Sequence, residues 1–400
     1  MNVPRTATEK MFGAKSGCQC SAHDVVGAHV DLLYLTDGSA PAVIDAFSKL
    51  GGQLSVGRPA VAISIDHYVP SPSALVTKRH QQIREFVTRT GCVLTEEGDG
   101  VCHQVLGEYG LVRAGDLVVG ADSHTVTYGS IGAFATGIGT TDAAVAMASG
   151  RLWFRVPESI RLNLKGRLSS GVSEKDLALY LNAHFGTTQA VYRSVEVYTE
   201  DPEIDLSPVC NTSVEWGAKF CLDMRYCPLS SDPEVSYAEV SDVYVTSIEP
   251  LVALPHTCDS VVKVRDAGRV PVHMVVIGTC SGGRLKDLEQ AAQVLENRRV
   301  NNNTRLLVVP ASRRIFLECM QRGILQTLAA SGAVVSPPGC GPCCGTSAGI
   351  PADGENVIST ANRNLRGRMG NPKANIYLAS PSTAAASAVA GQLADARDLE

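Results

Sequence analysis

Residues 61–91 read VAISIDHYVPSPSALVTKRHQQIREFVTRTG and contain one complete strand–helix unit. The run Val61-Ala-Ile-Ser-Ile65 is apolar and rich in β-branched residues, which predicts a buried strand. Residues 72–90 predict a helix, and Gly91 stands where a glycine commonly ends one, because glycine adopts the left-handed C-cap conformation without strain. A short strand followed by a longer helix is typical of parallel sheets, whose strands need a crossover connection.

The same alternation recurs along the whole chain and predicts the α/β class with mostly parallel strands. Further strands are expected at 117–120, 272–277, 306–309 and 333–335, and further helices at 141–149, 285–297 and 312–330.

With 400 residues the chain is longer than one ordinary domain of roughly 100–200 residues. Its composition shifts near Arg155-Val-Pro157, and turn-forming residues crowd the segment Cys227-Pro-Leu-Ser-Ser-Asp-Pro233. We therefore expect three units, at residues 1–157, 158–236 and 237–400.

Composition excludes several classes of protein. The net charge of −5 gives no electrostatic reason to expect nucleic acid or an anionic membrane as partner. No apolar run approaches the roughly 18–20 residues that span a bilayer, and the first ten residues lack the apolar stretch of an export signal. Thirteen cysteines, an odd number, favour reduced thiols over a disulfide framework, so we expect a cytoplasmic protein.

Chemically reactive residues cluster directly after the predicted strands. Asp66-His67 follows the first strand, Asp122-Ser123-His124 follows 117–120, and Cys280 follows 272–277. Cys340 and Cys343 follow the strand at 333–335. Because the carboxyl ends of parallel strands form the ligand crevice of such sheets, we expect these side chains to meet there.

The motif Cys340-Gly-Pro-Cys343 has a spacing that lets two thiolates hold one metal or cluster. Alone it leaves zinc, a redox dithiol and iron–sulfur open, and redox is the least favoured because no thioredoxin-like sequence surrounds it. Cys280 would supply a third thiolate, and three thiolates on a cubane leave one iron open as a Lewis acid. Cys344 is interpreted as a small residue that packs in the interior.

Two other segments have both a structural and a functional interpretation. In Gly120-Ala-Asp-Ser-His-Thr125, Asp122 could form a turn and His124 a buried core contact, or the two could form an acid–imidazole pair. Asn362-Arg-Asn-Leu-Arg-Gly-Arg368 could be a solvated loop, or its arginines could bind carboxylates in bidentate fashion.

Taken together and in this order, the motifs resemble those of aconitase-type hydro-lyases. The likeness runs from Glu9 to about Gly391 and is greatest to the large subunits of 3-isopropylmalate dehydratase and homoaconitase. It implies three α/β domains around a central iron–sulfur site, without the mobile swivel domain of aconitase. The motifs that carry it are Gly120-Ala-Asp-Ser-His-Thr125 with its trailing glycines, Ile277-Gly-Thr-Cys280, Cys340-Gly-Pro-Cys343 and Asn362-Arg-Asn-Leu-Arg-Gly-Arg368.

The resemblance also implies roles for individual residues. Cys280, Cys340 and Cys343 are similar to the three ligands of a [4Fe–4S] cluster with one labile iron, and Asp66-His67 is similar to the pair that assists loss of the substrate hydroxyl. His103, His124 and Glu215 resemble the set around the open iron, Asn211 and Asn362 resemble asparagines near the cluster, and Ser123, Arg363 and Arg368 resemble contacts to substrate carboxylates.

Two segments depart from the family pattern, and one loop of the family is missing. Many compact relatives have His-Asp-Gly where this chain has Thr36-Asp37-Gly38, and the usual Cys-Thr-Asn-Gly-Arg is here Cys280-Ser-Gly-Gly-Arg284. No Gly-Ser-Ser-Arg-Glu-like loop, which bears the base serine of the swivel domain, occurs in the sequence. The resemblance therefore implies a separate small subunit that supplies this serine.

The implied activity is dehydration and rehydration of a substituted malate, foremost 3-isopropylmalate, by a heteromeric enzyme. Homocitrate, citramalate, dimethylmalate and methylcitrate are alternative substrates. Two alternatives of other classes are an RNA-binding relative without a cluster and a structural zinc protein. The net charge of −5 argues against the first, because it provides no basic face at the level of composition.

Overall fold

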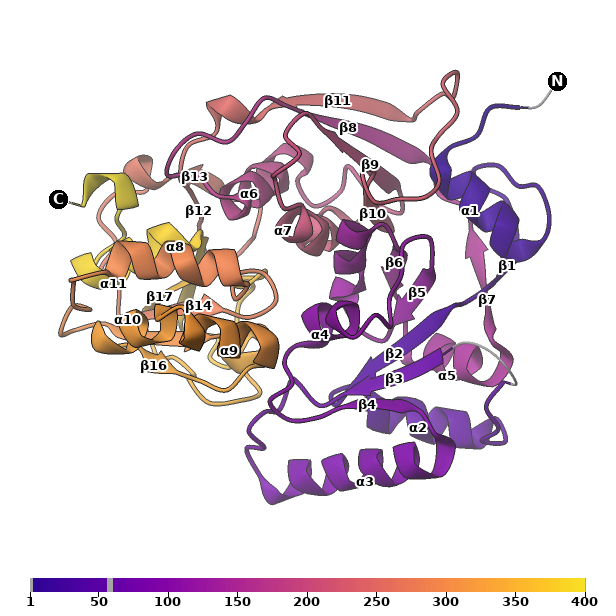
Figure 1. The fold of residues 1–400 in the computed structure, drawn as a ribbon, viewed down its shortest axis with the longest axis horizontal. Helices are drawn as coiled ribbons and strands as arrows, with labels where there is room; N and C mark the ends of the chain where they lie inside the picture. Colours follow the sequence, from indigo (N-terminus) through magenta and orange to yellow (C-terminus); the bar gives the residue numbers. More distant parts are fainter. Residues whose placement is uncertain (1–2, 56–59, 400) are drawn as a thin grey trace.

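A computed structural model describes residues 3–55 and 60–399, which form three larger sheets and one two-stranded ribbon, with helices packed on the sheets (Figure 1). The expected α/β class with mostly parallel strands is confirmed. The first sheet has five parallel strands in the order β4-β3-β2-β5-β6. These strands are β2 (Leu32–Thr36), β3 (Ala60–Ser64), β4 (Val93–Thr95), β5 (Leu117–Gly120) and β6 (Phe134–Gly137).

The two helices predicted in this first unit, at 72–90 and 141–149, are present as α3 and α5 and end where the sequence predicts. Gly91 and Gly150 adopt the left-handed conformation after α3 and α5, as expected of glycine C-caps. An antiparallel ribbon of β1 (Val25–His29) and β7 (Arg151–Arg155) stands beside the sheet. The helices are α1 (Ala7–Ser16), α2 (Ala40–Lys49), α3 (Ala74–Thr90), α4 (Cys102–Glu108) and α5 (Thr140–Ser149), and Ser123–Ile131 forms the 3-10 helix η1.

The middle sheet is parallel and has the strand order β10-β9-β8-β11. Its last strand, β11 (Glu239–Tyr244), pairs with β8 (Ser159–Lys165), so this sheet continues past the expected boundary at 236/237. We propose the division into three units on the arrangement of these sheets. The other elements here are β9 (Ser194–Thr199), α6 (Glu174–Phe185), α7 (Ser207–Thr212), η2 (Ser213–Trp216) and β10 (Phe220–Asp223).

The third sheet has seven strands in the order β13-β12-β18-β17-β14-β15-β16, with only the contacts of β12 antiparallel. The single helix expected at 312–330 is wrong: Gly323 takes a left-handed conformation with φ 74° and divides it into α9 and α10. The strands are β12 (Leu251–Ala253), β13 (Val261–Lys263), β14 (Met274–Gly278), β15 (Arg305–Val309), β16 (Val334–Val335), β17 (Asn356–Ser359) and β18 (Asn375–Ala379). The helices are α8 (Leu285–Leu295), α9 (Arg313–Gln321), α10 (Ile324–Ala330) and α11 (Pro381–Ala390).

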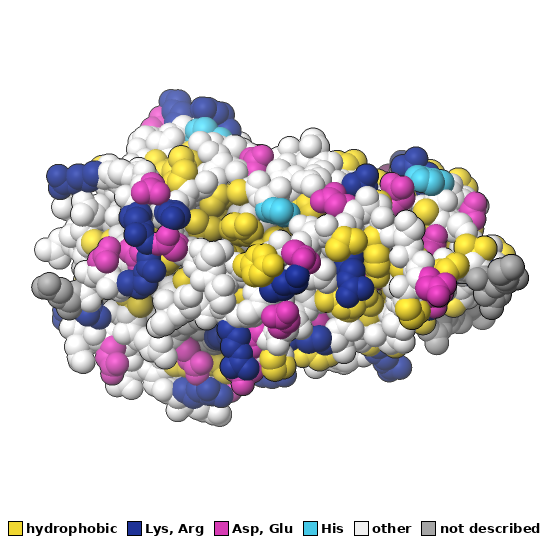
Figure 2. Space-filling model, turned by 90° about the horizontal axis from the view of Figure 1, so that it is seen from above, with side chains coloured by type: hydrophobic (Ala, Val, Ile, Leu, Met, Phe, Trp, Pro, Cys, Tyr) yellow, Lys and Arg dark blue, Asp and Glu magenta, His cyan; other side chains and the backbone are white. Residues whose placement is uncertain are grey.

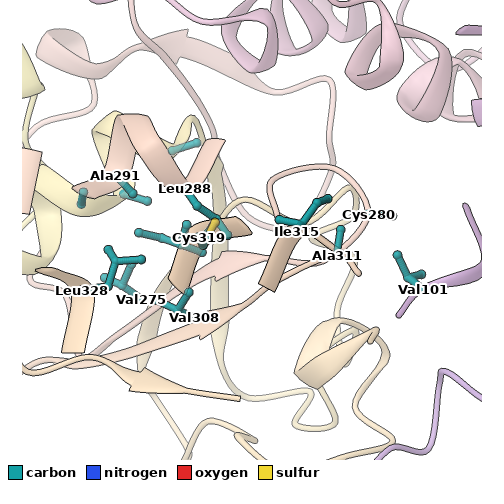
Figure 3. Close-up of a cluster of buried hydrophobic side chains, with 14 of the residues drawn as sticks. Val101, Val275, Cys280, Leu288, Ala291, Val308, Ala311, Ile315, Cys319 and Leu328 are labelled. Atoms are coloured by element: carbon teal, nitrogen blue, oxygen red, sulfur yellow. The ribbon is translucent and has the colours of Figure 1, made fainter. Parts of the chain in front are cut away.

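The three units pack closely where the reactive loops lie. Gly129 of η1 shows how close the backbones come, because a Cβ there would lie 1.6 Å from the carbonyl oxygen of Cys221 in β10. Figure 3 shows part of a buried cluster that the first and third units share, with Cys280 near Ala311 and with Val101 of the first unit beyond them. Cys280 therefore stands at the border between the first and third units.

The surface carries mixed charge. On the face shown in Figure 2, lysine and arginine side chains are interspersed with aspartate and glutamate. Among the described residues no helix is both long and apolar enough to cross a bilayer.

Candidate active site

The reactive loops of the first and third sheets meet at one cavity. β2, β3 and β5 run parallel, as do β14, β15, β16 and β17, so the carboxyl ends within each set lie at one edge. The loops after these strands enclose a cavity of about 250 Å³. It is lined by Thr36, Gly38, Ser39, His67, His103, Ala121, Asp122, Ser123, His124, Cys280, Cys340, Cys343, Cys344, Asn362, Arg363 and Arg368.

His67 is held between two carboxylates. Its Nδ1 lies 2.8 Å from Oδ1 of Asp66, and its Nε2 lies 3.4 Å from Oδ2 of Asp122. The other oxygen of Asp66 accepts the backbone N–H of Cys102 at 2.7 Å, which fixes the carboxylate. Burial by itself lowers the pKa of His67, but the charges of Asp66 and Asp122 outweigh it and raise that pKa well above its usual value. This shift favours the imidazolium form of His67, which can donate a proton into the cavity.

Asp122 links this imidazole to two further histidines. Its Oδ1 lies 3.2 Å from Nε2 of His103 and accepts the backbone N–H of His124 at 2.8 Å. Burial by itself raises the pKa of Asp122, but His103 and His67 hold it well below the usual range. Asp122 is thus an ionised carboxylate that fixes the wall of the cavity.

Glu215 of η2 joins His124 to the arginine loop. Its Oε1 accepts from Nε of Arg363 and lies 3.4 Å from Nε2 of His124. Burial raises the pKa of Glu215, but His124 and Arg363 more than offset this and lower it. Burial lowers the pKa of His124, which favours the neutral imidazole. Nη1 of Arg363 donates to Oγ of Ser123 at 3.1 Å, so these two residues form one polar surface.

Arg368 presents an unsatisfied donor. Within the described chain its buried Nε has no hydrogen-bond partner, while its Nη2 donates to Sγ of Cys343 at 3.4 Å. A buried donor without an acceptor costs free energy unless a ligand satisfies it. Because Arg368 lines the cavity, this donor favours an anionic ligand there.

Cys280, Cys340 and Cys343 are buried and share the wall of this cavity. Cys280 follows β14, and the other two belong to the loop that contains the 3-10 helix η5 (Gly341–Cys344). The side-chain amides of Asn211 and Asn362 donate to Sγ of Cys280 at 3.4 and 3.5 Å. Donors directed at sulfur stabilise thiolates and tune a bound metal group, so this set of residues fits a thiolate-ligated cofactor.

A single zinc ion fits this arrangement less well than a cluster. Zinc–sulfur bonds of roughly 2.3 Å would bring all ligand sulfurs to within about 4.6 Å of one another. Over residues 3–55 and 60–399, the three cysteines do not form a group whose ligand atoms all lie within 4.8 Å of one another. A cubane is larger than one ion and spaces its thiolates more widely.

Asp37, Asp66 and His67 do place possible ligand atoms within 4.8 Å of one another. The oxygens of Asp37 are already used, however, because they accept the backbone N–H groups of His67 and Tyr68 at 3.0 Å each. Nε2 of His80 lies 3.0 Å from the same carboxylate. These contacts orient the loop that carries His67. They explain why the side chains of Asp37, Asp66 and His67 lie close together without a bound cation.

All the residues that the sequence predicted for the site come together. Asp66, Asn211 and Glu215 contact the lining residues from behind. The others line the cavity directly: His67, His103, Ser123, His124, Cys280, Cys340, Cys343, Asn362, Arg363 and Arg368.

Sequence reasoning missed part of the lining. Thr36 and Ser39 line the cavity with their hydroxyl oxygens 3.3 Å apart. The sequence indicated Thr36 only as a departure from the family pattern, although this residue ends an apolar run and fits the same strand-end rule. Cys344, expected as a packed residue, also lines the cavity, with its Sγ 2.8 Å from Oγ1 of Thr346.

The two departures from the family pattern have different structural consequences. Thr36 faces the cavity and so changes its lining. Gly282 is a packing position, because a Cβ there would lie 2.2 Å from Oγ1 of Thr360.

Comparison with known proteins agrees with this geometry. The profile of the aconitase family (aconitate hydratase) matches residues 30–224 and 265–391. The chain belongs to the aconitase family. The expected family is thereby confirmed, and with it the hydro-lyase class of enzyme.

Relatives within the aconitase family match over their whole length. The 3-isopropylmalate dehydratase large subunit 2 of Archaeoglobus fulgidus is 42% identical, over 99% of both chains. The large subunit 1 from Thermotoga maritima is 40% identical and that from Methanopyrus kandleri 39%, each over 98% of this chain and 99% of the relative. Aconitase X of Thermococcus kodakaraensis, solved in its holo-form, has a similar fold with a TM-score of 0.55 at 12% identity, over 90% of this chain and 89% of that one.

Proposed function

We propose that this chain is the large, cluster-bearing subunit of a 3-isopropylmalate dehydratase. The observation that carries the proposal is one cavity that combines three cysteines, a histidine held between two carboxylates, and arginines. Full-length similarity to chains named as large subunits of that enzyme supports the substrate.

The cofactor would be a [4Fe–4S] cluster held by Cys280, Cys340 and Cys343, with Asn211 and Asn362 donating to sulfur. Aconitase-family proteins generally bind such a cluster, and the donor set described above fits one. When bound, a cluster with one iron lacking a protein ligand supplies a Lewis acid for the substrate hydroxyl.

In the proposed reaction, His67 protonates the hydroxyl as its carbon–oxygen bond breaks, so that it leaves as water. The proton on the neighbouring carbon must leave in the same dehydration, which forms a carbon–carbon double bond. Rehydration with the hydroxyl on the adjacent carbon gives the isomer, and no net redox change occurs.

Substrate carboxylates would be held by the polar surface of Ser123, Arg363 and Arg368. The free Nε of Arg368 supports this role because it lacks an acceptor. Glu215 fixes Arg363 from the side away from Ser123, which orients the guanidinium before substrate binds. Such preorganisation lowers the entropy cost of binding.

A small subunit is proposed as the partner, on the strength of the relatives' names. Within residues 3–55 and 60–399 the cavity provides an acid and anion contacts, and its carboxylates are engaged by histidines or arginine. A group that accepts the carbon-bound proton would therefore come from the partner.

Replacing Asp66 by asparagine should lower kcat by roughly 10²–10⁴-fold while the cluster content stays unchanged. The carboxylate of Asp66 raises the pKa of His67, so its loss lowers that pKa. Since the acid must be protonated, activity falls as pH rises through the His67 pKa, and the variant's alkaline limb should move to lower pH. The measurement is a kcat–pH profile of the cluster-loaded complex.

Glu158→Gln provides a matched control, because Glu158 contacts a different histidine, His23, at 3.6 Å outside the cavity lining. It should leave kcat and its pH profile unchanged. Wild-type turnover in a fully loaded Asp66→Asn complex would remove this acid from the mechanism.

The substrate is tested by a panel of hydroxy acids: 3-isopropylmalate, homocitrate, citramalate, dimethylmalate and methylcitrate. We expect the largest kcat/KM for 3-isopropylmalate. A clear preference for another acid would keep the hydro-lyase chemistry but reassign the substrate.

A further inference from the structure

Lys175 is a fully buried cation that the proposed reaction does not use. It is the second residue of α6, and its side chain has no solvent exposure. Its Nζ donates to the backbone carbonyl of Ala361 at 2.8 Å and to Oγ of Ser281 at 3.3 Å. Both acceptors are uncharged, and in the described ranges no carboxylate forms an ion pair with this ammonium.

The position opposes a positive charge in two ways. Burial removes the ammonium from water, which costs free energy unless an opposite charge compensates it. The N-terminal turn of a helix is also its positive end, where anions and not cations are favoured. Burial accordingly lowers the pKa of Lys175 to about 8, although the Cys280 thiol acts in the opposite direction.

The two contacts of Lys175 lead directly to the proposed cofactor site. Ser281 follows Cys280 in the chain, and Ala361 precedes Asn362, whose amide donates to Sγ of Cys280. Ser281 also donates to the carbonyl of Thr360 at 2.7 Å. The hydrogen bonds of Lys175 and Ser281 therefore connect the loop that carries Cys280 to the loop that carries Asn362. The buried ammonium is therefore attached to the loops that surround the thiolates.

Neighbouring cations are already neutralised, which distinguishes Lys175 from them. Arg284 is buried nearby but pairs with Asp205 and Asp287. Lys286 pairs with Glu174, and its side chain is half exposed. Among these three cations, Lys175 alone lacks a carboxylate partner.

We propose that Lys175 is the counter-charge of the iron–sulfur cluster: its ammonium compensates the negative charge of the three ligating thiolates and raises the cluster's reduction potential. The inference rests on the proposed cluster and goes beyond it, since it assigns a residue outside the ligand set. For a given type of cluster, net charge, hydrogen bonds to sulfur and solvent exposure determine the reduction potential. A buried cation acts strongly because solvent does not screen it. Lys175 is a positioning and tuning residue and does not touch substrate.

The test is a redox titration of the anaerobically loaded chain followed by EPR, for wild type and Lys175→Met. Methionine keeps much of the lysine stem without the charge. Reduction adds negative charge, so losing the ammonium should disfavour the reduced cluster by tenfold or more, a fall in midpoint potential of about 59 mV or more. An unchanged potential in a fully loaded variant would overturn the proposal.

Two control variants distinguish the effect of the ammonium charge from the effect of its hydrogen bond and from the effect of a charge at another position. Ser281→Ala removes one acceptor of the ammonium but keeps the charge, and Lys286→Met removes a charge that is paired and half exposed. Both should shift the potential much less than Lys175→Met does. A shift of equal size in Ser281→Ala would mean that the hydrogen bond, and not the charge, sets the potential.

Stability of the cluster-free protein provides a second readout. If the ammonium compensates the charge of the cluster, the unfolding temperature of cluster-free Lys175→Met should be no lower than that of the cluster-free wild type. The reason is that the variant lacks an uncompensated buried charge. A variant that fails to fold without the cluster would contradict the proposal. Wild-type protein that binds no cluster would instead refute the proposed function itself.

Discussion

Serine in place of Cys280 should abolish assembly of the cluster and reduce turnover to background. Cys280 is one of the three cysteines that the family pattern assigns as ligands, and the other cysteines in the described wall, Cys340, Cys343 and Cys344, all belong to the loop around η5, so none of them can replace it from its side of the cavity. Its Sγ is also the acceptor for the amides of Asn211 and Asn362, which would lose their partner. Iron and acid-labile sulfide per chain, measured after anaerobic reconstitution, are the direct readouts.

Cys344→Ser is the matched control, because Cys344 lies beside the ligand loop but is not assigned as a ligand. A serine hydroxyl can keep the contact with Oγ1 of Thr346. This variant should load iron and sulfide as wild type does. A complete cluster in Cys280→Ser would require a different ligand set. So would a result in which Cys344→Ser lacks the cluster while Cys280→Ser retains it.

The loaded chain alone should show almost no turnover, and adding the small subunit should restore it by orders of magnitude. The cavity supplies an acid and anion contacts, while the proton on carbon needs an acceptor that we assign to the partner. Closing the cavity would also exclude water, which strengthens each contact to the substrate carboxylates. The effect should therefore appear mainly in kcat and not only in KM.

The experiment compares anaerobic assays of the loaded chain with and without a candidate partner at equal cluster content. Binding of 3-isopropylmalate to the chain alone, followed by calorimetry, controls for an intact cavity. Comparable turnover without the partner would mean that this chain contains its own base.

Much of the site could be predicted because its residues directly follow strands. A run such as 61–65 reveals its strand through local pattern, and parallel pairing places the residues after each strand, such as His67 and Cys280, at the carboxyl edge of its own sheet, where both line the cavity. Family motifs supplied roles for residues such as Asn211, whose position behind Cys280 depends on packing between units.

What the sequence could not provide depends on tertiary contacts. Glu174, Lys175 and Asp176 form a charged run that is typical of a solvated helix end, yet all three are buried. The pairing of β11 with β8 joins residues about 80 positions apart, and no local pattern encodes it. The break at Gly323 was missed because an isolated glycine is tolerated within many helices.

We propose that one cavity holds both the cluster and the substrate. The most direct test is the EPR spectrum of the reduced, loaded chain with its partner, recorded before and after adding 3-isopropylmalate. We predict that substrate changes the cluster spectrum in wild type. If calorimetry shows that the substrate is bound but the cluster spectrum does not change, the substrate binds elsewhere and the proposed shared cavity is wrong.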